Sequence, residues 1–479
     1  MTRREVYWWI TGFILLDLVS FLGYYWPLVR PLGFIVVCAV VLVLAVFRFH
    51  IAVLIGLAEL AVGSFGHLLG LPWLGGELSL RMGIFTILFV VGSWRTVRQW
   101  RQGVWAWPPR SFLALLPLGL SIGLAFALGW FKGVPFGVLF RDGNGYLFIG
   151  FAVPLLAAAT DLHFRQRVVP LILIAAAYLA AKSLVLLYFF THRFEFFVID
   201  LYQWIRDSGA GELTPTASGV ERIFLQSQLY VLIAWWLALW QTRGHQRLSM
   251  ALPLSLMAMS SATLLISFSR SYWLGLIISL LAYVVWELVQ GSVVNLTRSV
   301  AFMVVTTFVG VGIILGVLNV PWPSPSSSGS LELADRLQVV EPAASSRWKL
   351  LGPLWSEVQE HALVGAGFGS AVTYVSDDPR VRARTPSGLY TTTAFEWGYL
   401  GMWLKLGIIG LTAYALVLVV TVRRAWLTDQ FRGPFGGLVF GLVALLSVHI
   451  ASPYLDHPLG LGYVLLVYAV VVAGFRKLV

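Results

Sequence analysis

The chain has 479 residues, of which 58% are hydrophobic and only 11% are charged, and its mean hydropathy is +0.82. A soluble domain carries about 25% charged residues, so this composition excludes a soluble globular protein. The formal net charge of +11 does not indicate nucleic-acid binding, because Lys and Arg stand in short clusters between apolar runs. We therefore expect an all-α integral membrane protein that crosses the bilayer many times.

Apolar runs suited to crossing a bilayer recur along the whole chain. One helical crossing needs about 17–25 apolar residues, and fourteen segments come near this length. They lie at 8–25, 31–47, 51–70, 82–97, 111–130, 146–160, 168–190, 223–241, 249–268, 271–289, 299–319, 397–422, 435–452 and 458–475. Gly and Pro interrupt the stretch 131–160, so the sequence predicts about 12–14 transmembrane helices.

The basic clusters predict how the chain is oriented. If residues 2–4 are cytoplasmic, the connections holding the clusters near 48, 95–110, 165–167, 243–247, 298 and 423–432 fall on that same side. Cytoplasmic loops carry an excess of Lys and Arg, so both termini are expected inside the cell. The first run has no small-residue cleavage site before it continues, which favours a retained helix over a removed signal peptide.

The predicted spans divide the chain into three parts. Residues 1–319 hold the first eleven spans and an outer loop at 191–222, whose aromatic, mixed-charge start HRFEFFVIDLYQWIRD predicts an amphipathic helix at the membrane surface. Residues 320–395 form a large outer loop that opens with the Pro/Ser-rich linker PWPSPSSSGS. Residues 396–479 hold the last three spans.

Helical spacing inside the large loop predicts a helix with one apolar stripe. The residues of that stripe are Trp348, Leu351, Trp355 and Val358. Pro353 predicts a kink or a fresh start, which would leave Arg347 in a separate turn before the helix.

Arg270 stands in SFSRSYW, where two predicted spans meet with almost no loop between them. Such an arginine either extends to lipid headgroups or binds an anion. The flanking Ser269 and Ser271 favour the anion, because the turn then offers several donors. Arg347 in the large loop can approach the same surface, and two guanidiniums are suited to holding a diphosphate without a metal ion.

Glu396 begins the span after the large loop. Its carboxylate either complements the helix dipole or, if partly desolvated, serves as a general base toward a sugar hydroxyl. Lys182 and Lys405 are cations within spans, and such residues usually face a bundle interior. Asp17 and Glu59 are candidate partners for them.

Three further patterns leave alternatives open. Asp377 and Asp378 either bind a metal ion or form a turn before Pro379, and we favour the turn. The glycines of VGAGFGS either expose backbone amides to phosphate or form a tight turn that shapes the site, and we favour the turn; they are Gly365, Gly367 and Gly369. Asp456 and His457 are a second possible acid–base pair.

Together these motifs resemble the O-antigen ligase and O-antigen polymerase superfamily, over about residues 260–415. The matching segments are Ser269–Arg270–Ser271, Ser346–Arg347–Trp348, the run EHALVGAG at 360–367, EWGYL at 396–400 and GIIGL at 407–411. Ligases of this family have a catalytic His where this chain has Glu396. A chain-extending polymerase, or a transferase with another acceptor, is therefore as compatible with the resemblance as a ligase.

The resemblance implies a glycosyltransferase of the bacterial inner (cytoplasmic) membrane, with its site facing the periplasm or outside. It would move glycan from an undecaprenyl-diphosphate carrier to a hydroxyl of a saccharide or glycolipid acceptor, with inversion and without metal or cofactor. The expected partners are this donor, the acceptor and membrane lipids. The expected site residues are Arg270, Ser269, Ser271 and Arg347 for the diphosphate, Trp348 and Tyr399 for substrate contact, and Glu396 as base.

Two other classes of function remain open. A transporter or flippase of lipid-linked sugars would suit the intramembrane cations Lys182 and Lys405, but it needs no outer loop with SRW and EHALVGAG. A non-catalytic membrane scaffold would leave Arg270 and Glu396 unexplained.

Overall fold

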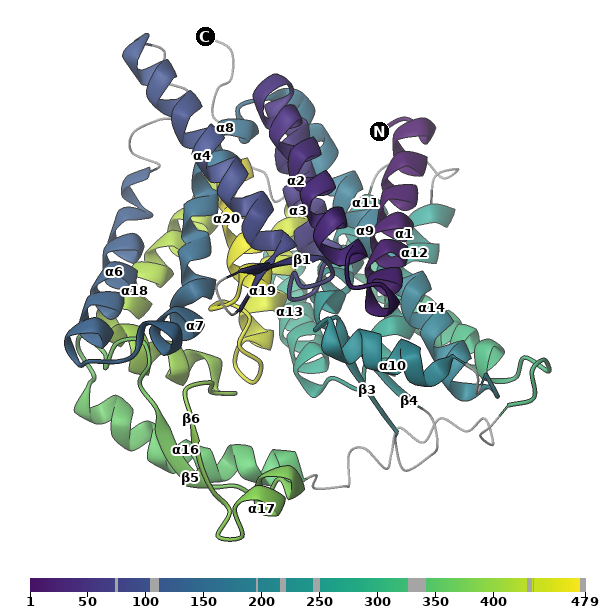
Figure 1. Ribbon diagram of the computed structural model, residues 1–479. Coiled ribbons are helices and arrows are strands. Elements are labelled where there is room, and N and C mark those ends of the chain that lie inside the picture. Colours follow the sequence, from purple (N-terminus) through teal and green to yellow (C-terminus); the bar gives the residue numbers. More distant parts are fainter. Residues whose placement is uncertain are drawn as a thin grey trace. The chain divides into compact units, whose positions relative to one another are not determined.

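The computed structural model describes residues 1–73, 76–103, 112–194, 197–215, 221–243, 250–325, 342–428, 433 and 435–473. Within these residues the secondary structure is overwhelmingly α-helical, and the strands form three two-stranded antiparallel hairpins (Figure 1). The chain divides into two compact units. The first comprises Met1–Ala106, Val153–Asp335 and Asp429–Leu445, and the second comprises Trp107–Ala152, Arg336–Thr428 and Leu446–Val479.

The first unit holds the larger helical bundle. Its helices are α1 (Arg3–Tyr25), α2 (Val29–Phe47), α3 (Phe49–Val62), α4 (Leu80–Arg101), α8 (Ala152–Ala159), α9 (Leu162–Thr191), α10 (Val198–Asp207), α11 (Leu229–Gln241), α12 (Ala251–Ile266), α13 (Arg270–Val289), α14 (Val293–Leu318) and most of α19 (Gly436–Val448). Its hairpins pair β1 (Gly70–Trp73) with β2 (Gly76–Ser79), and β3 (Gly211–Pro215) with β4 (Glu221–Leu225), which η2 (Gln226–Gln228) follows. The predicted surface helix in the 191–222 loop is present as α10.

The second unit holds the elements of the large loop. Its helices are α6 (Leu116–Phe131), α7 (Phe136–Leu147), η1 (Phe148–Phe151), α16 (Pro342–Glu360), α17 (Pro379–Arg384), α18 (Gly398–Leu427) and α20 (Pro458–Ala473). Its hairpin pairs β5 (Val372–Val375) with β6 (Leu389–Thr392), in a register that sets Val372 opposite Thr392.

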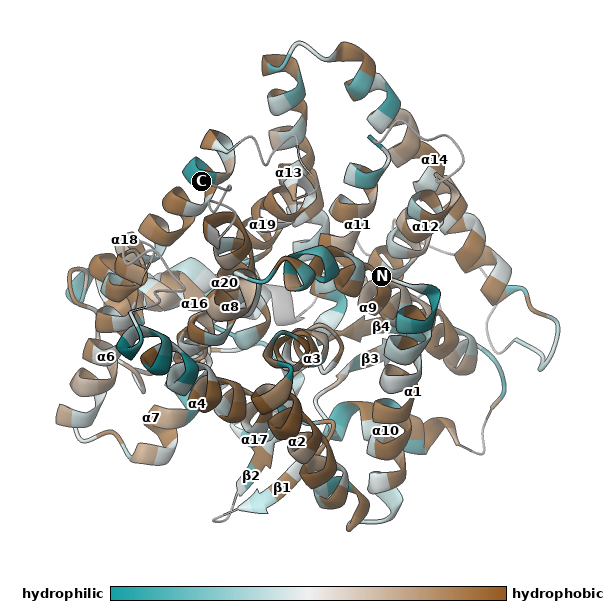
Figure 2. Ribbon diagram, turned by 90° about the horizontal axis from the view of Figure 1, so that it is seen from above, coloured by the Kyte–Doolittle hydropathy of each residue, from teal (hydrophilic) through white to brown (hydrophobic). Residues whose placement is uncertain are grey.

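The helices have the length and composition of membrane spans. Eight in the described part of the chain are long and apolar enough to cross a bilayer: α1, α2, α4, the run Phe136–Ala159, α9, α13, α14 and α18. Each of the fourteen predicted segments also contains helix. Figure 2 shows hydrophobic residues along the helices and hydrophilic ones at ends such as the start of α1. The all-α, multi-span class is therefore confirmed, while a crossing by each shorter helix stays a prediction.

The core of the first unit is centred on α11. Every residue from Leu229 to Trp240 is buried, as expected for a helix that is apolar on all sides. Its two central tryptophans each need a hydrogen-bond acceptor for the indole N–H. Trp235 donates to Ser261 Oγ at 3.1 Å and Trp236 donates to Ser279 Oγ at 3.0 Å. Serines of α12 and α13 thus allow these polar groups to be buried.

The core beneath the large loop differs from the predicted stripe. The buried hydrophobic residues of α16 are Leu350, Leu354 and Val358, whereas Trp348 and Trp355 are exposed. Tryptophan prefers a half-exposed edge, while aliphatic residues at i, i+4 and i+8 fill one face completely. The predicted separate turn for Arg347 is also wrong, because α16 runs unbroken from Pro342 past Pro353. Leucines buried on either side of the proline compensate for its missing hydrogen bond.

Candidate functional site

The Arg270 turn reverses the chain in three residues between α12 and α13. Phe268 adopts a left-handed backbone conformation with φ 46°, which is unfavourable for a bulky residue. Burial of the Phe268 ring, and a 3.2 Å hydrogen bond from Ser269 N to Ser267 Oγ, hold the turn. Ser269 and Ser271 are both buried, with their hydroxyls 3.0 Å apart. Arg270 is therefore the member of the SRS motif that reaches the surface.

A second arginine lies at the same turn and was not predicted from the sequence. Arg222 of β4 donates from Nε to the carbonyl oxygen of Ser267 at 3.0 Å. Its guanidinium lies 4.9 Å from the centre of the Phe224 ring, and Phe224 stacks on Tyr272 of α13 at 5.7 Å. The alternation of Arg222 and Phe224 along one strand was the available signal, but no local pattern predicts that a hairpin docks on this turn.

Two arginines and a helix N-terminus meet at the Arg270 turn. Arg270 is the first residue of α13, at the positive end of the helix dipole. The side chain of the N-cap residue Ser269 makes no capping hydrogen bond. A cation is unfavourable at a helix N-terminus unless an anion binds there. Arg222 adds a second guanidinium, which Glu212 approaches only to 3.7 Å. The turn is thus suited to a phosphate or diphosphate group.

Arg347 and Glu396 form an ion pair in the second unit. Nε of Arg347 contacts a carboxylate oxygen of Glu396, and the two side chains are 44% and 47% exposed. Trp397 donates from Nε1 to the carbonyl oxygen of Arg347 at 2.9 Å, and its ring packs edge-on against Trp348 at 5.2 Å. We expected desolvation to dominate at Glu396. Instead the carboxylate is half exposed, in the bend before α18, and it is paired with Arg347.

Asp377 anchors the start of α16 beside Arg347. Its carboxylate accepts hydrogen bonds from Lys349 at 2.7 Å, from Ser345 at 2.7 Å and from Arg382 at 2.6 Å. The bonds from Lys349 and Ser345 are the main reason that the pKa of Asp377 falls to about 2. The carbonyl oxygen of Asp378 accepts the amides that open α17, so the turn interpretation is confirmed.

The intramembrane lysines have carboxylate partners. Lys182 pairs with Asp17 at 2.6 Å, as one of the two candidates predicted. Glu59 pairs instead with Arg81 at 2.9 Å. Lys405 pairs at 2.6 Å with Asp142, which the sequence did not single out because Gly and Pro hide the helix around it.

The remaining predicted residues lie near the start of α18. The Tyr399 hydroxyl donates to the carbonyl oxygen of Leu446 at 2.9 Å, and its ring packs against the buried His449. Nδ1 of His449 accepts from two backbone amides, at 3.0 and 3.1 Å, so this unpredicted histidine is structural. Burial raises the pKa of Asp456, and the nearby charge of Lys405 offsets only part of this rise. Asp456 therefore stays the alternative base.

The predicted site residues fall into two groups. Arg347, Trp348 and Glu396 lie together in the second unit, whereas Arg270 lies with its two serines in the first. An approach of Arg270 to Arg347 thus stays a prediction. On α16, Glu357, Glu360 and His361 place possible ligand atoms within 4.8 Å of one another. Helical spacing alone produces such a partly exposed cluster, so we assign no metal to it.

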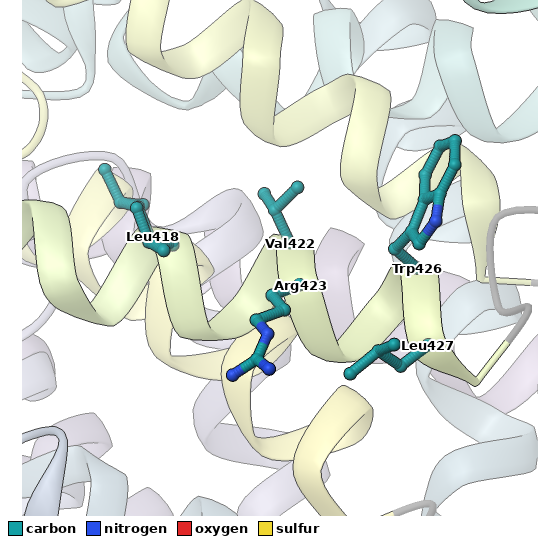
Figure 3. Close-up of a pocket in the computed structure, with 6 residues that line it drawn as sticks. Leu418, Val422, Arg423, Trp426 and Leu427 are labelled. Carbon is teal, nitrogen blue, oxygen red and sulfur yellow. The ribbon is translucent and has the colours of Figure 1, made fainter.

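A surface groove lies near the C-terminal end of α18 (Figure 3), whereas Glu396 precedes the N-terminal end of that helix. It is lined by Leu418, Val419, Val422, Arg423, Trp426 and Leu427. An apolar helix face that ends in Arg and Trp is typical of contact with lipid chains and headgroups. The groove contains none of the predicted site residues, and we assign no substrate to it.

Comparison of the chain with models of known families, with curated proteins and with solved structures found no match. The functional argument therefore depends on the residues and on their geometry.

Proposed function

We propose that this protein is a glycosyltransferase of the bacterial cytoplasmic membrane, of the O-antigen ligase or polymerase type. It would transfer a glycan from undecaprenyl diphosphate to an acceptor sugar hydroxyl at the outer face. The observation that carries the proposal is the ion pair between Arg347 and Glu396. It joins a possible diphosphate ligand to a possible general base, and these residues come from the SRW and EWGYL motifs that resemble the family.

The chemistry is a direct displacement at the anomeric carbon of the donor sugar. Glu396 accepts the proton of the acceptor hydroxyl. At the same time the hydroxyl oxygen attacks the anomeric carbon from the side opposite the diphosphate. The bond from the carbon to the diphosphate oxygen breaks, and the leaving oxygen keeps the electron pair. The guanidinium of Arg347 stabilises this charge, and Arg270 would add a second guanidinium if it approaches as the sequence predicts; this is the same contribution that a metal ion would make. The product has inverted configuration.

The ion pair also suggests how the base is released. While Arg347 contacts Glu396, the guanidinium occupies a carboxylate oxygen that would otherwise be available to the acceptor hydroxyl. A diphosphate carries more negative charge than a carboxylate and offers bidentate geometry to the guanidinium. Donor binding would therefore draw Arg347 away and free Glu396 for the acceptor. In this proposal the base becomes active only when the leaving group is in place.

Aromatic side chains beside the ion pair support a saccharide substrate. Trp348 and Trp397 form one pair, and Trp355 and Trp403 form a second at 5.7 Å. Trp348 and Trp355 are exposed. Exposed indole rings on rigid elements provide apolar faces on which the C–H faces of sugar rings can pack, and their N–H groups provide donors.

The rival transporter function loses its main support. That hypothesis relied on Lys182 and Lys405 as free cations lining a cavity for an anionic substrate. Each ammonium instead has a carboxylate at 2.6 Å. Paired charges contribute little attraction to a passing anion, so we favour the enzyme.

The test is reconstitution of the purified protein in lipid vesicles with an undecaprenyl-diphosphate oligosaccharide, candidate acceptors and a chelator. We expect release of undecaprenyl diphosphate together with elongated or transferred glycan. The Glu396→Gln protein is the matched control, and it should bind the donor without transfer. Movement of the intact donor across the vesicle bilayer, without cleavage, would support the transporter instead.

A further inference from the structure

A non-helical segment, which is exposed at Leu363 and Val364 and buried from Gly365 onward, packs against a break in α18. Gly407 has φ 68°, so the helix loses its regular hydrogen bonds at that point. The segment 362–367 replaces them on both sides of the break. Ala366 N donates to the carbonyl oxygen of Leu404 at 2.6 Å, and Ile408 N donates to that of Ala362 at 2.9 Å. The glycine turn predicted from VGAGFGS is therefore part of the helix packing.

Close backbone approach explains the glycines at the break. A Cβ on Gly407 would lie 2.3 Å from the carbonyl oxygen of Leu363, and one on Gly365 would lie 2.5 Å from Gly407 N. Both residues have positive φ, which favours glycine. The contact leaves no room for a side chain, so any shift of the glycine segment must also move α18.

Asp142 of α7 fixes this segment. One carboxylate oxygen pairs with Lys405 Nζ at 2.6 Å, and the other accepts from Gly369 N at 2.7 Å. The Asp142 and Lys405 side chains are only 5% and 6% exposed. Lys132 adds a hydrogen bond from Nζ to the carbonyl oxygen of Ala366 at 2.8 Å. A buried carboxylate with both oxygens engaged is costly to leave without its partners.

The latch, which we define as Asp142, Lys405 and Gly369, connects to both partners of the proposed site. The glycine segment follows directly from the C-terminal end of α16, the helix that carries Arg347. Lys405 Nζ also lies 5.4 Å from the centre of the Phe395 ring, and Phe395 precedes Glu396 in the chain. The same ion pair thus contacts the segment leading from Arg347 and the residue next to Glu396.

We propose that Asp142 is a positioning residue, which through Lys405 and Gly369 holds α16 against α18 so that Arg347 meets Glu396. This inference rests on the proposed glycosyl transfer for its catalytic consequence. Misplacement of reacting groups by about 1 Å can lower a rate by about 100-fold. We therefore expect Asp142→Asn to lower kcat by roughly 10- to 100-fold, while KM for the donor changes little.

The kinetic experiment separates positioning from general loss of folding. The double variant Asp142→Asn/Lys405→Gln removes both buried charges yet keeps two amides able to hydrogen-bond, so it should recover much of the lost kcat. Asp17→Asn is the matched control, because it removes the carboxylate of the other lysine pair, in the first unit. It should leave kcat within about twofold of the unmodified protein.

A second measurement does not depend on activity. Spin labels at Gly352 of α16 and Thr412 of α18, both exposed, would report the distance between these helices in nanodiscs after Cys38→Ala. We expect Asp142→Asn to broaden the distance distribution and Asp17→Asn to leave it narrow. If Asp142→Asn expresses poorly, Lys132→Met should show a smaller broadening of the same kind.

The two measurements fail independently. Absence of transfer by the unmodified protein would refute the proposed function, while the distance distributions would still test the latch. An Asp142→Asn protein with unchanged kcat and an unchanged distribution would overturn the positioning role.

Discussion

The Arg270 turn and the Arg347–Glu396 pair both present an exposed arginine next to a helix start, but the groups described beside that arginine differ. At the turn, Arg270 and Arg222 add to the positive end of α13, and Glu212 is the acid within ion-pair range of Arg222. At the pair, one guanidinium meets one carboxylate. We expect the two arginines at the positive end of α13 to bind the donor diphosphate, and the pair to exchange partners during a reaction.

This difference assigns separate tasks to arginines that looked equivalent in the sequence. Loss of positive charge at the turn should weaken donor binding. Loss of either partner in the pair should impair the chemical step, because the base and the leaving group are coupled there. The following changes test that division, from the largest expected effect to the smallest.

Glu396→Gln should produce the largest effect. Glutamine keeps the size and hydrogen bonding of the side chain but cannot accept the proton, so transfer should fall by roughly 10²–10⁴-fold. Donor binding should be largely kept, as measured by retention of labelled lipid-linked oligosaccharide. Glu396→His, which introduces the residue found in ligases of the similar family, should retain measurable transfer. Normal turnover by Glu396→Gln together with an inactive Asp456→Asn protein would move the base to the loop before α20.

Arg→Lys changes should distinguish the two regions. Lysine keeps the charge but loses the bidentate fork, and a charge-assisted contact contributes about 1.5–3 kcal/mol, or roughly 10- to 100-fold in rate. For Arg270→Lys we expect mainly a higher KM for the donor, and for Arg347→Lys mainly a lower kcat. Steady-state kinetics at matched protein levels measure both. Full activity in both variants would leave contact with lipid headgroups as the better account of these arginines.

Arg222→Gln should have a smaller effect of the same kind as Arg270→Lys. Arg222 contributes one of two guanidiniums at the turn, and it is half engaged with the Ser267 carbonyl and Glu212. We expect donor KM to rise by about tenfold or less, with kcat kept. Arg206→Gln is a suitable control, because Arg206 of α10 is exposed and pairs with its neighbour Asp207. Equal effects from both variants would show that only overall charge matters.

Most of the fold could be predicted because hydrocarbon imposes a simple rule. A crossing segment must be apolar and helical, so composition located helices in all fourteen segments. Intramembrane charges must also pair, which is why Asp17 was a correct candidate for Lys182. Asp142 was not predicted as a partner because its helix begins at a Pro–Phe–Gly sequence, a pattern that predicts a loop and not a membrane helix.

The geometry of the candidate site was harder to predict. Arg347 and Glu396 are 49 residues apart in the chain, and no periodicity brings such residues together. Their proximity followed only from the resemblance. Arg222 was missed because its position depends on the hairpin of β3 and β4 docking on Phe268 and its neighbours, a tertiary contact without a local signal. The predicted apolar stripe of α16 was wrong because it included two tryptophans. Their large rings can lie at the exposed edge of the buried helix face and need not be buried.

Acid pH should loosen the Arg347–Glu396 region while leaving the Arg270 turn intact, and this is the smallest expected effect. The bonds from Lys349 and Ser345 keep the pKa of Asp377 near 2 in the folded protein, against about 3.9 for a free aspartate. A carboxyl with a lowered pKa stabilises the fold above its unfolded value, and that contribution is lost as the pH falls through the folded value. The attachment of α16 should thus be constant down to about pH 4 and weaken between about pH 4 and 2.

Amide exchange of residues 345–360, corrected for the intrinsic pH dependence of exchange, measures how firmly α16 is attached. The Asp377→Asn protein should show faster exchange of this helix at pH 7 and a weaker response to acid, because the group that titrates is gone. Peptides from α12 and α13 serve as the internal reference, since the partners of Asp377 described above belong to α16 and α17. An acid response of α16 that is the same in both proteins would assign the effect to another carboxyl, with Glu396 the first candidate, and would make the attachment of α16 depend on the same ion pair that we propose opens during the reaction.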